Sequence, residues 1–122
     1  MGFLGRTNDA QQEKLTDTQL VADVFGPACY IASSLPVVLY LAYKYSADDY
    51  AHDARTAFRR ALLANTNAGG ENCHRGSALG ALMGAAAGVD NIDKELLTGL
   101  AAYPQLREEL ELFCAQNTST IR

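Results

Sequence analysis

The sequence has no tryptophan, only two histidines and only three cysteines in 122 residues. Cys29, Cys73 and Cys114 form an odd set without CxxC spacing. This pattern argues against the disulfide framework of a small secreted domain and favours a reducing compartment. We therefore expect a cytoplasmic location.

Excess positive charge is also absent: ten lysines and arginines stand against fourteen acidic residues, a net charge of −4. A nucleic-acid partner would require a clustered basic face, so none is expected. The start of the chain has only a brief apolar patch and predicts neither a signal peptide nor a membrane anchor. The most apolar run, residues 25–43, contains Gly26, Pro27 and Pro36, and is interpreted as two buried helical pieces rather than a membrane span.

No alternating strand pattern and no internal repeat is present, so the sequence predicts an all-α fold. We expect a compact multi-helix domain of six or seven helices around one central glycine- and alanine-rich helix. Residues 1–14 are expected to form a flexible N-terminal arm, residues 15–116 a single all-α domain, and residues 117–122 a frayed tail. The predicted helices cover residues 17–25, 28–33, 35–45, 46–64, 71–87, 90–100 and 104–116.

Caps and apolar faces set the details of these helices. Thr16 or Asp17 can cap the first one, and Ser46 with Asp49 resembles a capping box for the helix that ends near residue 64. Residues 35–45 are apolar nearly all round, which is typical of a buried helix. Asp90 or Asn91 can cap the helix that follows Gly88. The last helix is expected to turn three side chains inward, those of Leu106, Leu110 and Phe113.

Glycines recur every four residues along the central helix, at positions 76, 80, 84 and 88. Each internal glycine costs about 1 kcal/mol relative to alanine. The stripe therefore predicts close approach of another backbone in a tight soluble helix contact.

The entrance of this helix, residues 65–75, is polar. Gly69 and Gly70 let the backbone bend closely, and the first helical amides carry partial positive charge. Glu71, His74 and Arg75 share one helix face. Two interpretations stay open: these residues tie the loop and the helix together, or they bind a ligand. The ligand-binding candidates are Asn65, Asn67, Gly69, Gly70, Glu71, Asn72, His74 and Arg75.

Residues 65–88, NTNAGGENCHRGSALGALMGAAAG, resemble the C-terminal signature of the ADP-ribosylglycohydrolase family, which includes crystallin-like relatives. In that family a Gly-Gly pair precedes Asp-x-Asp-Thr/Ser and a helix with repeated small residues. Gly69 and Gly70 match the pair, and Gly80, Gly84 and Gly88 match the helix. The resemblance covers roughly residues 24–113 and implies the fold of the C-terminal part of the family.

The resemblance also implies a pair of magnesium ions held by the acidic and hydroxyl residues of the signature. These positions fall on Glu71, Cys73 and His74, so Glu71 is the only oxygen ligand that is retained. Nothing before Asp23 resembles the family's N-terminal acidic motif. We predict no metal site, no cofactor and no catalytic residue in this chain.

Other chemistries at these positions receive little support. Cys73 and His74 are adjacent on a helix and point in different directions, which argues against a nucleophile–base pair. A zinc site would need further ligands, for which only His52 and Cys29 are candidates.

Two functions follow. The first is a shortened, non-catalytic relative of the family that self-associates, most simply as a dimer, or binds a partner through the apolar helix at residues 36–43 or the face at residues 106–113. The second is binding of an ADP-ribose-like nucleotide sugar at the helix entrance, with residual N-glycosidic hydrolysis. Arg75 and the helix amides would then contact the phosphates.

Overall fold

The computed structural model describes residues 15–46 and 53–118, and this part of the chain contains six α-helices and no strand. The prediction of an all-α fold is therefore confirmed. No helix in the described ranges is long and apolar enough to cross a membrane. In chain order the elements are α1 (Asp17–Gln19), a π-helical turn η1 (Leu20–Phe25), α2 (Ile31–Ser46), α3 (Ala54–Asn67), α4 (Asn72–Ala87), a 3₁₀ turn η2 (Val89–Asn91), α5 (Lys94–Thr98) and α6 (Tyr103–Thr118).

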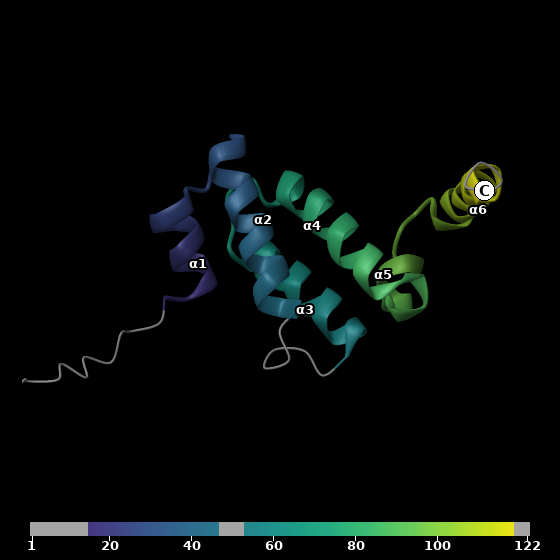
Figure 1. The fold of residues 1–122 in the computed structure, drawn as a ribbon, viewed down its shortest axis with the longest axis horizontal. Coiled ribbons are helices and arrows are strands. Elements are labelled where there is room, and N and C mark those ends of the chain that lie inside the picture. The colour runs from purple at the N-terminus through teal and green to yellow at the C-terminus, as the bar shows by residue number, and fades with distance from the viewer. Residues whose placement is uncertain (1–14, 47–52, 119–122) are drawn as a thin grey trace, which may run out of the picture.

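The three helices α2, α3 and α4 form the body of the molecule, and α1 with η1 packs against α2 (Figure 1). The glycine helix is α4, and it contacts both α2 and α3, so its predicted central place is confirmed. The core residues are Val21, Val37, Val38, Leu41, Ala42, Ala57, Phe58, Ala61, Ala68, Leu79 and Met83.

The glycines of α4 lie under side chains of α3. A Cβ at Gly76 would be 3.2 Å from Asn65 Nδ2, one at Gly80 would be 3.7 Å from Leu62, and one at Gly84 would be 3.5 Å from Phe58. The residue numbers of the α3 partners fall, from Asn65 to Phe58, as those of the glycines rise from Gly76 to Gly84, so the two helices run antiparallel. The predicted tight contact with another helix is therefore found, but side chains of α3, rather than its backbone, lie nearest to the stripe.

The first helical segment begins as predicted. Thr16 caps it in a capping box with Gln19, and Gly26, with φ of +86°, ends it. Val21 is fully buried, whereas Val24 is exposed. The predicted arm, residues 1–14, lies outside the described residues.

Helix α2 differs from the prediction because it runs unbroken through Pro36. The proline lies in the second turn, where its missing N–H removes one helical hydrogen bond without ending the helix. Ser34 lies inside α2, and its hydroxyl donates to the carbonyl of Ala28 at 3.0 Å.

Only one face of α2 is buried, so the expectation that this helix is buried on all sides is wrong. Its opposite face exposes four large apolar side chains at intervals of four residues, with exposed fractions from 48% to 81%. We call this surface the outer stripe of α2, and it consists of Ile31, Leu35, Leu39 and Tyr43.

Helix α3 begins and ends later than predicted. Ser46 is the last residue of α2, and Asp53 caps α3 by accepting the N–H of Thr56 at 2.7 Å. The predicted roles of Asp49 and His52 fall outside the described residues. At its other end α3 continues through Asn67, so Asn65 and Asn67 are helical rather than part of a loop.

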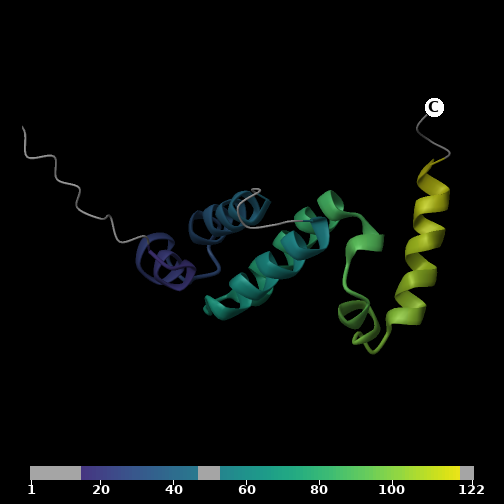
Figure 2. The ribbon, with the colours of Figure 1, turned by 90° about the horizontal axis from the view of Figure 1, so that it is seen from below.

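The C-terminal helices α5 and α6 lie beyond the end of α4, outside the α2–α3–α4 body (Figures 1 and 2). The predicted cap from Asp90 or Asn91 is wrong, because these residues form η2 and α5 starts at Lys94. Helix α6 begins at Tyr103, and its Leu106, Leu110 and Phe113 are exposed, which corrects their predicted inward placement. Figure 2 shows α6 standing apart from the α2–α3–α4 body.

Candidate functional site

The loop between α3 and α4 is positioned by Gly70. Gly69 and Gly70 both have positive φ, +71° and +63°. A Cβ on Gly70 would lie 2.6 Å from the carbonyl oxygen of Pro27, whereas one on Gly69 would meet nothing within 4 Å. The N–H of Glu71 donates to the same Pro27 carbonyl at 3.0 Å. The loop therefore lies directly on the turn that precedes α2, and this contact requires glycine at position 70.

Arg75 and Asn65 are buried, with exposed fractions of 1% and 2%. Arg75 Nε donates to Asn65 Oδ1 at 3.1 Å, and Arg75 Nη2 donates to the carbonyl of Gly69. Asn65 Nδ2 in turn donates to the carbonyl of Asn72 at 2.8 Å. We call this set the Arg75 clip, because it joins the end of α3, the loop and the start of α4.

The Arg75 clip carries a buried charge. Burial lowers the pKa of Arg75, and the nearby charge of Glu71 opposes this shift. Arg75 Nη1 has no hydrogen-bond partner among the described residues. The guanidinium thus faces the protein interior, where it donates to Asn65 Oδ1 and to the carbonyl of Gly69.

The outward side of the helix entrance carries Glu71, Cys73 and His74. His74 Nδ1 lies 2.9 Å from Glu71 Oε2, as expected from their shared face. Glu71 occupies the N-cap position, but its side chain does not cap the helix. The Cys73 thiol lies 3.5 Å from Asn72 Oδ1. The Nδ2 group of the same asparagine donates to the carbonyl of Thr66. The thiol and the imidazole therefore have separate neighbours and do not form a nucleophile–base pair.

The side chains at the signature positions do not fit a magnesium centre. Mg²⁺ requires an octahedral shell of oxygen ligands, and a thiol and an imidazole supply none. The one carboxylate, Glu71, contacts His74. Across residues 15–46 and 53–118 there is no group of three or more His, Cys, Asp or Glu side chains that could hold a metal ion.

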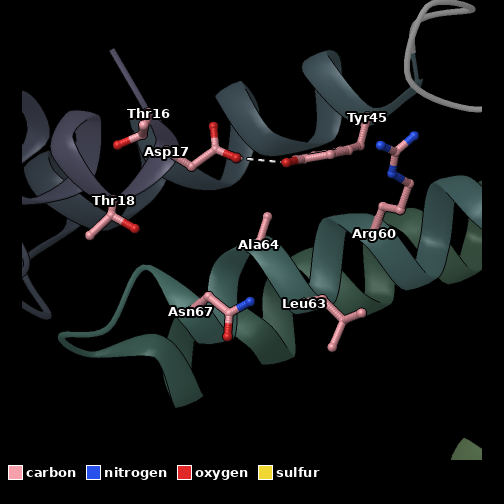
Figure 3. Close-up of a pocket in the computed structure, with 8 residues that line it drawn as sticks. All are labelled: Thr16, Asp17, Thr18, Tyr45, Arg60, Leu63, Ala64 and Asn67. Atoms are coloured by element: carbon pink, nitrogen blue, oxygen red, sulfur yellow. Dashed lines mark hydrogen bonds between the residues drawn. The ribbon is translucent and has the colours of Figure 1, made fainter.

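A groove of about 400 Å³ lies beside the entrance, between the start of α1 and the end of α2 on one side and α3 on the other (Figure 3). Its lining mixes hydroxyl, amide, charged and apolar groups, and includes one of the predicted ligand residues, Asn67. The lining residues are Thr16, Asp17, Thr18, Tyr45, Arg60, Leu63, Ala64 and Asn67.

At one edge of this groove Asp17 accepts three hydrogen bonds from α2. The donors are Tyr40 Oη at 2.8 Å, Lys44 Nζ at 2.6 Å and Tyr45 Oη at 2.6 Å. We call these four residues the Asp17 cluster. It ties α1 to the C-terminal half of α2, and it leaves Asp17 saturated with donors.

The electrostatics of the Asp17 cluster follow from this bonding. Burial alone would raise the pKa of Asp17, but the three hydrogen bonds and the charge of Lys44 hold it below the usual value. Burial and the Asp17 charge raise the pKa of Tyr45 to about 12. This cluster was not predicted from the sequence, where its only signal is the i, i+4 spacing of Tyr40 and Lys44 on one helix face.

Comparison with known proteins gives one family. The family model described as ADP-ribosylglycohydrolase matches residues 4–120. Neither the curated proteins nor the solved structures contain a match to the chain.

Proposed function

The chain belongs to the ADP-ribosylglycohydrolase family, and within that family we propose that it is a non-catalytic member. It is a helical domain whose function is to self-associate as a dimer. The proposal assigns it to the cytoplasm, where the exposed thiols of Cys29, Cys73 and Cys114 stay reduced.

The outer stripe of α2 is the observation that carries the proposal. Four large apolar side chains on consecutive helical turns are between 48% and 81% exposed. Contiguous exposed apolar surface of this kind marks an interaction site. The single charged residue of α2 is Lys44, which binds Asp17 rather than standing in the stripe. An uncharged stripe can receive a second copy of the chain, because the contact places no charge of the stripe against a like charge.

The helix entrance supports the non-catalytic part of the proposal. Glu71, Cys73 and His74 offer one hard oxygen ligand where the family resemblance implies several. Arg75 is directed into the protein by the Arg75 clip. The polar residues of the entrance thus hold α3, the loop and α4 together.

A second candidate function is binding of an ADP-ribose-like nucleotide sugar, with residual hydrolysis. The observation in its favour is the groove in Figure 3, whose volume of about 400 Å³ falls within the range of small-molecule sites. Asn67 joins this groove to the helix entrance, and Arg60 supplies a cationic group to its lining.

Sedimentation velocity over about 1–100 μM tests the association, a range that spans typical dissociation constants of modest dimers. The native chain is expected to be dimeric at the upper end. Leu39→Glu should shift it to monomer, because it places a charge in the outer stripe. Leu82→Glu is the matched control, since Leu82 is similarly exposed (46%, against 55% for Leu39) but lies on α4. A native chain that stays monomeric throughout would overturn the proposal.

Calorimetry with ADP-ribose, with and without magnesium, tests the second candidate. No heat and no thermal stabilisation are expected. Magnesium-dependent binding would contradict the non-catalytic assignment and favour the second candidate.

A further inference from the structure

Helix α6 has an apolar face that packs on nothing in the described chain. Residues Pro104 to Asn117 are all exposed, and the two views show the helix apart from the body. Leu106, Leu110 and Phe113 are spaced i, i+4 and i+7, so they share one face. Most of the stability of a protein helix comes from packing of its apolar face rather than from intrinsic helix propensity. This face therefore requires a contact to be stable.

The outer stripe of α2 is apolar like this face and long enough to receive it, because the stripe covers residues 31–43 and the face residues 106–113. Both α2 and α6 have 16 residues. The stripe contains no charge. On α6, Arg107 Nε donates to Glu111 Oε1 at 2.8 Å, and this pair does not lie on the face of the three apolar side chains. Docking α6 on the stripe would bury the three apolar side chains and leave Arg107 and Glu111 in water. Pairing α6 with α6 would instead bring together two helices that each carry three glutamates and one arginine.

The connection to α6 limits which stripe this helix can reach. Residues 99–102 join α5 to α6, and four residues span at most ~14 Å. The outer stripe faces away from α4, the helix that leads to α5, because the buried face of α2 packs toward α3 and α4. The α2–α3–α4 body thus separates α6 from the stripe of its own chain (Figures 1 and 2).

We infer that α6 of each protomer packs its Leu106–Leu110–Phe113 face on the outer stripe of α2 in the other protomer. This inference rests on the proposed self-association and names its contact. Two equivalent reciprocal contacts close a twofold dimer and leave no open end for further growth. Together they double the surface of one helix pair, which a stable interface of at least about 1,000 Å² requires.

A matched pair of variants on α6 tests the contact. Leu110 and Leu112 have similar exposed fractions, 62% and 57%, but Leu112 lies on the other side of the helix. Leu110→Glu is expected to weaken dimerisation at least about tenfold, which corresponds to 1.4 kcal/mol, whereas Leu112→Glu should change it less than about threefold. Equal effects of the two variants would overturn the inference.

Disulfide trapping identifies the paired elements. Cys114 lies one turn beyond Leu110 on α6, and Leu35 lies in the outer stripe. In a Cys29→Ser/Cys73→Ser background, Leu35→Cys is expected to give a covalent dimer on mild oxidation, with position 35 linked to position 114. The background protein without the added cysteine measures links between two copies of Cys114, and Leu82→Cys is the control for chance collisions.

Mixing isotopically labelled and unlabelled chains before oxidation tells the outcomes apart by peptide mass. A link from 35 to 114 between chains supports the inference. The same link within one chain overturns it, because α6 would then cover its own stripe. A dimer in sedimentation without this link also overturns it but leaves the proposed self-association intact. A monomer in sedimentation removes both.

Discussion

At the scale of single residues, the two loop glycines are predicted to respond differently to alanine. Gly70→Ala combines a left-handed φ with a Cβ 2.6 Å from the Pro27 oxygen, whereas Gly69→Ala meets only the unfavourable φ. We expect Gly70→Ala to lower the free energy of unfolding by about 3 kcal/mol or more and Gly69→Ala by about 1–2 kcal/mol. Urea denaturation measures both, and equal losses would mean that the contact with Pro27 is not tight.

The Asp17 cluster predicts how stability depends on pH. The folded-state pKa of Asp17 is lowered, so its contribution is present above the ordinary value of 3.8 and is lost as pH falls through the folded value. Asp17→Asn should cost about 2 kcal/mol at pH 7, because three donors lose a charged acceptor. This difference should disappear in acid. Tyr45, with its pKa raised to about 12, adds a contribution that is full below pH 10 and is lost as pH rises toward 12.

Denaturation of the native chain and Asp17→Asn between pH 2 and pH 8 checks the acid limb. Asp23→Asn is the control, because Asp23 is exposed on the neighbouring turn η1. Its difference from the native chain should be small at every pH. A gap for Asp17→Asn that does not narrow as pH falls below 3.8 would contradict the role given to the ionised carboxylate.

These residues also show which features of the site can be predicted from the sequence and which cannot. The Gly-Gly pair was found from sequence because positive φ and close approach demand glycine, a local property. The burial of Asn65 and Arg75 was not predictable, because a polar side chain near a helix end gives the same pattern whether it faces solvent or a backbone carbonyl of the loop or the next helix. The Asp17 cluster joins residues more than twenty positions apart, and only the packing of α1 on α2 creates it.

At the scale of elements, the glycine stripe predicts opposite effects for two alanine substitutions. At Gly80 the new Cβ would make an ordinary contact at 3.7 Å with Leu62, so the helix-propensity gain of up to about 1 kcal/mol should appear as added stability. At Gly76 it would be 3.2 Å from Asn65 Nδ2, an atom held by its bond to Asn72. Gly76→Ala should therefore destabilise the chain.

Thermal unfolding of the two variants compares them directly, with Tm expected to rise for Gly80→Ala and fall for Gly76→Ala. A loss of stability in Gly80→Ala would indicate that a Cβ at position 80 lies closer to Leu62 than 3.7 Å. The pair separates glycine needed for space from glycine that the helix could replace.

Element boundaries were predictable where the signal is local. Thr16 and Gly26 mark the two ends of the first helical segment because a capping box and a positive φ depend on neighbouring residues alone. The helix boundary predicted before Pro36 was wrong. A proline that costs one hydrogen bond is tolerated inside α2 because the same helix buries Val37, Val38 and Leu41. Asn65 and Asn67 extended α3 beyond its expected end for a related reason, because the Arg75 clip supplies the tertiary contacts that hold the last turn.

At the scale of the whole molecule, apolar periodicity located helical faces but not what covers them. Leu106, Leu110 and Phe113 have the spacing of an inward face, and that spacing is the same whether the partner is in the chain or in a second copy. The same holds for the outer stripe of α2. Two unmatched apolar faces on one chain are what a domain completed by its own dimerisation would present.

Dimerisation of this kind predicts that stability depends on protein concentration. If only the folded chain dimerises, mass action adds about 1.4 kcal/mol per dimer for each tenfold rise in concentration, and Tm should rise by roughly 2–5 °C. Leu39→Glu should abolish this dependence while keeping the Tm of the dilute native protein, because it alters an exposed position and leaves the core intact. Leu82→Glu should keep it. A native Tm that is constant from about 1 to 100 μM would instead mean that unfolding is not coupled to association, and the apolar faces of α2 and α6 would then be uncovered in the folded state.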